Sequence, residues 1–198
     1  MRILVGGALA LVLALGAPGS TAAKSYKVDV QHTSVSFRVK HLFTSVEGRF
    51  NEFEGTIIFD AAAPDATKIT GLIATASIDT NVEKRDNHLR GADFFAVEHF
   101  PQITFESTKV TDADVEAGTA KVHGNLTIKD VTKPVVIDAK FLGEVADPWG
   151  NKKAGFSGTT MINRKEFGLN WNQALETGGL LVGEEVEIRI EAETYVGE

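Results

Sequence analysis

Most of the chain after residue 23 alternates apolar and polar residues in short runs, and Gly, Pro, Asn or Asp interrupt these runs about every ten positions. Residues 186–192, which read Val-Glu-Ile-Arg-Ile-Glu-Ala, are one example. A period of two indicates antiparallel strands with one buried face and one wet face. Such a chain can form a sandwich or a closed barrel. A barrel of this size often encloses an apolar cavity, so a small lipophilic ligand is the first functional hypothesis.

The first 23 residues have the pattern of a secretory signal peptide. Arg2 provides a positive start, and residues 3–15 form an apolar run that is too short to span a bilayer as a helix. Small residues at 21–23 then provide a cleavage site after Ala23. We therefore expect a signal peptide over 1–23, a folded domain over 24–198, a periplasmic location and no stable membrane anchor.

The composition of the remaining chain excludes several kinds of protein. Removal of Arg2 with the leader changes the formal charge from -7 to -8. This acidic balance argues against nucleic acid as a partner and against adhesion to anionic lipid surfaces. The chain has no Cys, which excludes thiol chemistry, disulfides and thiolate metal sites. The length fits one domain with its own core, and no linker divides it.

The alternation predicts about eight to ten strands, many of them joined by hairpin turns. The expected strands cover residues 26–30, 35–39, 53–59, 72–78, 103–106, 121–128, 135–142, 154–162 and 186–195. Gly48, Gly55, Gly71, Gly124 and Gly158 lie within or beside these patterns. Glycine in a strand is typical of bulges, corners and close approaches, so these positions favour a strongly curved closed sheet over a flat sandwich.

Residues 80–90 break the alternation, because nearly every position is charged or polar. Val82 and Leu89 are seven apart and share one face of a helix. We expect Thr80 or Asn81 to cap this helix and Gly91 to end it, with a second short turn over 93–97. A helix between two strands would cover one end of a barrel.

The sequence carries no catalytic motif and no cofactor fingerprint. The five histidines lack the spacings that place two zinc ligands on one face, so we expect no metal site. No Gly-x-Ser-x-Gly elbow, phosphate-binding loop or dinucleotide fingerprint is present. The abundant carboxylates fit a plain acidic surface.

The charged segment and the aromatic residues each allow two interpretations. Arg85, Asp86, Arg90 and Asp93 could form a salt-bridge network that holds the helix on the barrel, or an arginine could receive a polar head group at a cavity mouth. The 12 Phe residues could fill a packed core or line a hollow one. The alternation pattern does not distinguish a packed core from a hollow one.

Several separated motifs, in order along the chain, resemble one known family. They are residues 29–37, 39–41, 46–50, 53–55, 85–90 with 93–95, 100–105, 124–128 with 132–135, 163–164 and 167–169. Together they resemble the YceI-like family of secreted bacterial lipocalin-like proteins. The resemblance implies an all-β antiparallel barrel of about eight strands with a short helix at one end. It also implies the binding of a polyisoprenoid or similar amphipathic chain in an internal cavity, homodimers in some members, and no established catalytic residues.

We therefore expect a periplasmic carrier of a polyisoprenoid, a quinone or a similar long-chain lipid, with no cofactor and no enzymatic activity. The candidate cavity residues are Phe37, Val39, Phe43, Phe50, Phe94, Phe95, Phe105, Leu126, Ile128, Phe156 and Trp171. Arg85, His88 and Arg90 are candidates for binding the head group or for anchoring the helix. Two alternatives remain: a lipid-modifying enzyme on the same barrel, which would use Arg85, Asp86 and His88, and a stress-response interaction module with a packed interior.

Overall fold

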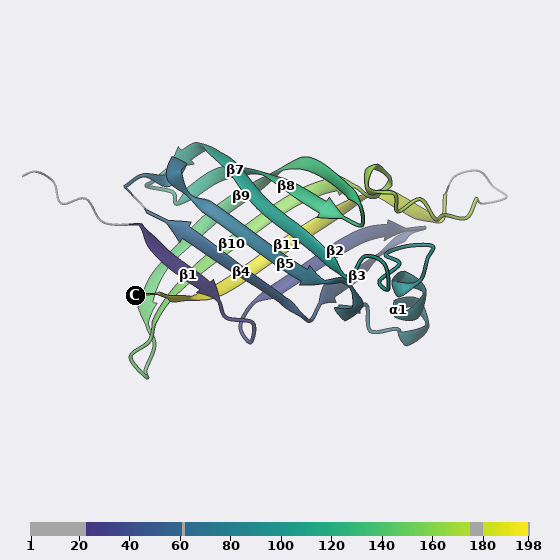
Figure 1. Cartoon of the computed structure of the whole chain (residues 1–198), viewed down its shortest axis with the longest axis horizontal. Coiled ribbons are helices and arrows are strands. Elements are labelled where there is room, and N and C mark those ends of the chain that lie inside the picture. The colour runs from purple at the N-terminus through teal and green to yellow at the C-terminus, as the bar shows by residue number, and fades with distance from the viewer. Residues whose placement is uncertain (1–22, 61, 175–179, 198) are drawn as a thin grey trace, which may run out of the picture.

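The computed structural model describes residues 23–60, 62–174 and 180–197, and within them the chain is almost entirely β-sheet (Figure 1). The expected leader, apart from Ala23, lies outside the described residues. The strands are β1 Lys24–Val28, β2 Ser34–His41, β3 Thr44–Phe50, β4 Phe53–Phe59, β5 Lys68–Ala74, β6 Ile78–Asp79, β7 Gln102–Asp114, β8 Thr119–Ile128, β9 Val131–Ala146, β10 Lys152–Asn163 and β11 Val182–Val196. The helix α1 spans Glu83–Arg90, and 3-10 turns occupy Pro64–Ala66, Thr75–Ser77 and Arg164–Phe167.

The strands form a closed antiparallel barrel with a short extension. Eight strands pair in the order β1-β4-β5-β7-β8-β9-β10-β11, and pairing of β1 with β11 closes the ring. The long strand β11 also pairs with β2 through Val182–Glu191, and β3 and β6 continue outward from β2. The expected all-β barrel of about eight strands with a short helix at one end is confirmed.

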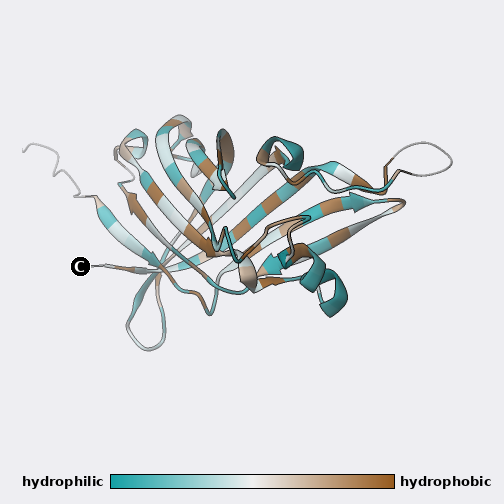
Figure 2. Ribbon diagram, turned by 45° about the vertical axis from the view of Figure 1, so that its right-hand side comes forward, coloured by the Kyte–Doolittle hydropathy of each residue, from teal (hydrophilic) through white to brown (hydrophobic). Residues whose placement is uncertain are grey.

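Figure 2 shows the alternation of hydrophobic and hydrophilic residues along the strands that places one face of each strand inside. The inward residues form two clusters. The larger cluster includes Phe50, Ile78 and Phe167 and lies toward α1, whereas Tyr26, Ile57 and Ala154 form a smaller one toward the opposite end. Both clusters follow from the period of two, because every second residue of a barrel strand faces the interior.

One strand was missed and others had different bounds. β3 escaped detection because Gly48 interrupts its alternation; a Cβ at this position would lie 2.4 Å from Cζ of Phe37, so the ring occupies the place of a side chain. The strand expected over 72–78 runs over Lys68–Ala74 instead. Thr75 leaves the sheet because its N–H donates to Pro101 O (2.9 Å) and its hydroxyl to Phe100 O (2.7 Å).

Strand β9 also begins earlier than expected, at Val131, and contains Pro134. A proline removes a ladder donor and is tolerated where one side of a strand is unpaired. Pro134 lies opposite Asn125 of β8, whereas β10 pairs with β9 only from Asp138 onward. The proline therefore occupies a stretch of β9 that has a neighbour on one side only.

The helix forms where it was expected, but its cap differs. Val82 is the N-cap residue, and no side chain caps the first turn. Thr80 hydrogen bonds to the buried Asp86 instead, through its N–H (2.9 Å) and its hydroxyl. The helix ends at Arg90, directly before Gly91, as predicted. In the part of the chain that the structure describes, no helix is both long enough and apolar enough to cross a membrane.

Candidate functional site

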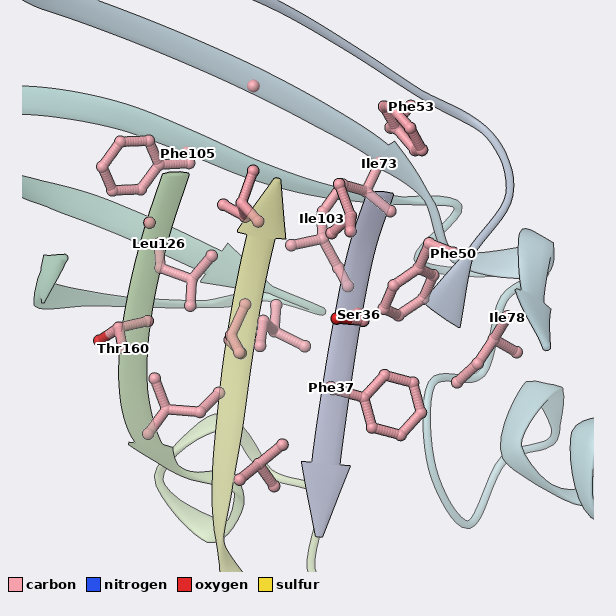
Figure 3. A pocket seen from close by; sticks show the side chains of 18 of the residues that line it. Ser36, Phe37, Phe50, Phe53, Ile73, Ile78, Ile103, Phe105, Leu126 and Thr160 are labelled. Atoms are coloured by element: carbon pink, nitrogen blue, oxygen red, sulfur yellow. The ribbon is translucent and has the colours of Figure 1, made fainter. Parts of the chain in front are cut away.

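The barrel encloses a cavity of about 660 Å³. Its wall comes from strands all around the ring and from α1, and most of the wall surface is apolar (Figure 3). Ile103, Phe105 and Leu126 project into this space from β7 and β8, and Phe37 faces it from β2. A cavity of this size and character is typical of a binding site for a small lipophilic molecule. The packed-interior alternative is therefore wrong.

Small residues on the inner face keep the barrel hollow. Gly55 and Gly71 lie directly opposite each other on β4 and β5, and Ala139, Gly158 and Ala192 occupy inner positions of β9, β10 and β11. A Cβ placed on Gly71 would meet no atom within 4 Å, so it would project into open space. An eight-stranded barrel lies at the limit between filled and hollow, and these small residues leave room for a ligand.

Aromatic side chains fill the end of the barrel away from α1. Phe141 lies 5.0 Å from Phe59 and 5.3 Å from Phe156 between ring centroids, and Tyr26 lies 5.3 Å from Phe156. Burial and the neighbouring carboxylate raise the pKa of Tyr26, so its protonated hydroxyl donates to Glu144 Oε1 (2.6 Å). This distal aromatic cluster (Tyr26, Phe59, Phe141 and Phe156) occupies the space that would otherwise extend the cavity.

Ten of the eleven cavity candidates line the cavity. They are Phe37, Val39, Phe50, Phe94, Phe95, Phe105, Leu126, Ile128, Phe156 and Trp171. Phe43 is the exception, because it lies at the tip of the β2–β3 hairpin with 92 % of its surface exposed. Its assignment to the cavity was wrong, since the strand ends at His41 and the side chain beyond it has no wall to join.

Sequence reasoning missed much of the wall contributed by the later strands. Val135, Ile137 and Ala139 line the cavity from β9, and Ile188 and Ile190 line it from β11. The signal was clear in β11, where Ile188 and Ile190 alternate with polar residues, and weaker in β9, where the apolar Val136 separates Val135 from Ile137. The candidate set was drawn mainly from aromatic residues and included no residue of these two strands.

The cavity meets the solvent at the α1 end. The exposed residues Val82 and Lys84 lie on its lining there, together with Arg85 and His88. The His88 ring packs edge-on against Trp171 (4.9 Å between centroids) and Phe94 (5.1 Å), and its Nε2 lies 2.8 Å from Asp93 Oδ2. These contacts connect the helix to the segment after β10 and fix the shape of the mouth.

The arginines of α1 have different positions. Arg85 lines the cavity and donates to Thr80 Oγ1 (2.7 Å) and Thr80 O (2.8 Å). Arg90 does not line it; its guanidinium donates to Ala76 O and Ile78 O, both at 2.7 Å. Arg90 therefore anchors the helix to the strand before it. Of the two interpretations of this segment, the Arg–Asp salt-bridge network is wrong, because among the described residues neither arginine forms an ion pair and Asp93 pairs with His88 instead.

A further cation, Arg164, lies on the lining and was not predicted. It is buried, and its guanidinium donates to Gly183 O (2.8 Å), to Trp171 O (2.9 Å) and to Leu169 O. Burial lowers its pKa, and the charge of Glu184 opposes that shift. Arg164 thus ties Leu169 and Trp171 to Gly183 at the mouth. An arginine in a short turn gives no sequence signal for such a role.

Several carboxyls with shifted pKa values lie away from the cavity wall. The carboxyls of Asp29, Asp79 and Glu144, which have lowered pKa values, all lie outside the lining. Asp86, which the enzyme alternative requires, is buried against Thr80 rather than on the lining. Of the three residues named for that alternative, only Arg85 and His88 reach the cavity.

One cluster of potential metal ligands lies away from the cavity mouth. Ligand atoms of Asp29, His32 and Glu193 lie within 4.8 Å of one another, an arrangement that histidine spacing did not predict. The ammonium group of the buried Lys153 contacts both carboxylates, at 2.8 Å from Glu193 Oε1 and even closer to Asp29 Oδ2. The lysine therefore already supplies the positive charge that balances this cluster.

Fold and site together define a closed β-barrel that, among the described residues, encloses an apolar cavity of about 660 Å³. The family model described as YceI-like domain matches residues 26–194, and the chain belongs to that family. The resemblance drawn from the separated motifs is thus confirmed.

Curated relatives agree in sequence. A UPF0312 protein of Pseudomonas paraeruginosa is 46% identical over 165 residues, which cover 82% of this chain and 85% of the relative. A UPF0312 protein of Ectopseudomonas mendocina is 47% identical over 152 residues, or 75% of this chain and 78% of the relative.

Solved structures agree in fold. Burkholderia cenocepacia BcnA superposes with a TM-score of 0.73 at 26% identity, covering 84% of this chain and 98% of BcnA. The Campylobacter jejuni YCEI protein superposes with a TM-score of 0.67 at 32% identity, covering 80% of this chain and 90% of that protein. A polyisoprenoid binding domain from Saccharophagus degradans superposes with a TM-score of 0.62 at 14% identity, covering 87% of this chain and 98% of that domain. At this identity the likeness is one of fold alone.

Proposed function

We propose that this protein binds and carries a long-chain amphipathic lipid of the isoprenoid or quinone class. The observation that carries the proposal is the apolar cavity of about 660 Å³, which runs along the inside of the closed barrel and reaches the solvent at α1. An apolar wall stabilises a bound tail by roughly 25 cal/mol for each Å² removed from water. Tight binding therefore needs no covalent chemistry.

The polar end of the ligand lies at the α1 mouth in this proposal. Lys84 and Arg85 line the cavity there without an ion-pair partner among the described residues, and His88 adjoins them. Such donors suit acceptor oxygens, either quinone carbonyls or phosphate. Arg90, the third head-group candidate, serves as an anchor for α1 because backbone carbonyls engage its guanidinium.

The compartment that suits this function is the periplasm. The leader-like pattern of residues 1–23 supports that location, and a carrier between two membranes would work there. The polyisoprenoid binding domain from Saccharophagus degradans has the same fold, which supports the class of ligand at the level of architecture.

The test is native mass spectrometry of the full chain purified gently from producing cells, combined with mass spectrometry of its organic extract. We expect one lipid per cavity, with a tail rich in isoprene units. A protein that carries no lipid and also refuses added quinones and isoprenoids at micromolar concentration would overturn the proposal. The same extract identifies the head group and therefore distinguishes a quinone from a phosphorylated isoprenoid.

A further inference from the structure

The turn between β2 and β3 has an unusual composition. His41 pairs with Thr44, so the hairpin turns through only two residues, Leu42 and Phe43. Leu42 adopts a φ of 48°, a left-handed conformation that Gly or Asn adopts more readily than a bulky residue. Phe43 is 92 % exposed. A strained Leu followed by an exposed Phe destabilises the isolated hairpin, and such strain points to a function at the tip.

This tip lies at the mouth of the cavity. The N–H of Leu42 donates to Leu181 O (3.1 Å), and both His41 and Leu181 line the cavity. Figure 1 shows the β2–β3 hairpin, the segment that enters β11 and α1 at the same end of the barrel. Leu180 and Val82, also at this end, are 45 % and 46 % exposed. We call Leu42, Phe43, Val82 and Leu180 the portal patch.

Basic side chains flank the portal patch. Lys40 donates to Phe43 O (3.0 Å), which holds its ammonium group beside the tip, and Lys84 follows Val82 by two residues. Neither lysine forms an ion pair within the described chain. Three carboxylates at this end already have basic partners: Glu47 pairs with Arg38, Glu184 with Lys165, and Asp93 with His88. Glu83 and Glu185, also at this end, form no ion pair within the described chain. Lys40 and Lys84 therefore present ammonium groups, unpaired within the described residues, beside the apolar tip, where they can contact the phosphates of anionic lipids.

We propose that the portal patch docks on the surface of a bilayer that contains anionic phospholipid, so that lipid enters or leaves the cavity without crossing water. The inference rests on the proposed function, because a lipid cargo must come from a lipid phase. A two-residue tip is much smaller than the surface that a stable protein partner covers, but it suits insertion at the boundary between head groups and acyl chains. The net acidity of the chain argued against such surfaces, but Lys40 and Lys84 place two ammonium groups, unpaired in the described part of the chain, directly beside the patch.

The test is vesicle flotation of the purified chain on phosphatidylcholine, with and without phosphatidylglycerol. We expect binding that grows with phosphatidylglycerol and weakens with salt, and a loss of about tenfold or more in Phe43→Ser. Lys40→Gln should reduce only the component of vesicle binding that depends on phosphatidylglycerol. Trp149→Ser is the matched control, since Trp149 is 85 % exposed in the β9–β10 turn at the opposite end and should have no effect.

A second measurement separates this inference from the proposed function. Lipid offered from detergent micelles should load Phe43→Ser as well as the wild type, because Phe43 lies outside the cavity wall. If the wild type takes up lipid but binds no vesicles, the docking proposal is overturned while the lipid-carrier function stands. The same conclusion follows if Phe43→Ser binds vesicles as well as the wild type does. If Phe43→Ser instead converts a dimer to a monomer in light scattering without changing vesicle binding, a second copy covers the patch and docking is likewise overturned.

Discussion

Individual residue sizes decide whether this barrel is full or empty. Phe105 and Gly124 illustrate the rule, because a Cβ on Gly124 would lie 2.3 Å from Cζ of the Phe105 ring. At Gly71 the opposite holds, since a side chain would meet only open space. The same residue type therefore makes room for a neighbouring ring at one position and for the cavity at another.

Gly71→Phe should fill part of the cavity without straining the sheet. Position 71 pairs regularly with Gly55 and Phe105, and a Cβ there would meet no atom within 4 Å, so the side chain would start into open space. We expect the dissociation constant of an apolar fluorescent probe to rise about tenfold or more, equivalent to ~1.4 kcal/mol, with no loss of thermal stability. Gly71→Ala is the control and should change binding only slightly. Unchanged probe affinity in Gly71→Phe would place the binding site elsewhere.

At the scale of elements, α1 closes one end of the barrel through polar contacts rather than through a large apolar face. Figure 2 shows the helix as almost uniformly hydrophilic. Asp86 joins it to Thr80, and Arg90 joins it to the carbonyl groups of Ala76 and Ile78. Elements that bury little apolar surface open at lower free energy than the core, so α1 suits a mouth through which a ligand passes.

Asp86→Ala should loosen α1 while leaving the barrel folded. The change leaves the buried N–H of Thr80 without its acceptor, which costs about 1–3 kcal/mol locally. We expect faster hydrogen exchange in residues 80–90 and faster release of a bound probe. Glu83→Gln, at an exposed position of the same helix, should leave both rates near those of the wild type. An equal acceleration of exchange in the barrel strands would contradict a local role.

For the molecule as a whole, closure of the barrel depends on β1 meeting β11 over a short stretch. Of the residues of β1, Tyr26, Lys27 and Val28 pair with β11. Beside them, Lys153 of β10 bonds to Asp29 and Glu193 and lies over the Tyr195 ring, 3.6 Å from its centroid. This buried group of charges ties β10, β11 and the turn after β1 together. Removing one member of such a pair costs about 3 kcal/mol.

The Asp29–Lys153 pair should make the stability of the barrel sensitive to acid. Burial alone would raise the pKa of Asp29, but hydrogen bonds from Lys153 and His32 outweigh it and lower the pKa far below its usual value. A depressed pKa contributes stability above the unfolded value of about 3.9, and this contribution is lost as the pH falls below it.

Urea unfolding at several pH values should therefore show Asp29→Asn less stable than the wild type near pH 7, with the difference shrinking below about pH 4. Asp130→Asn, an exposed change in the β8–β9 turn, should show no such trend. A difference between Asp29→Asn and the wild type that stays constant with pH would exclude the charge of Asp29 as its cause.

The alternation of apolar and polar residues determined the fold class, because a period of two allows only one side of each strand to be buried. The break in this alternation predicted the helix, and the aromatic residues together with a few aliphatic ones predicted ten residues that line the cavity. The alternation missed β3, where Gly48 replaces an apolar residue beneath Phe37.

Only the tertiary structure decided whether the interior was hollow, which cations faced it and where Phe43 lay. Cavity volume depends on the small residues Gly55, Gly71, Ala139, Gly158 and Ala192, which come from five strands spread along the chain and meet only when the barrel closes. Arg164 became part of the mouth because carbonyl groups of a later segment surround it. These features depend on contacts between distant segments, and a pattern of neighbouring residues carries no information about them.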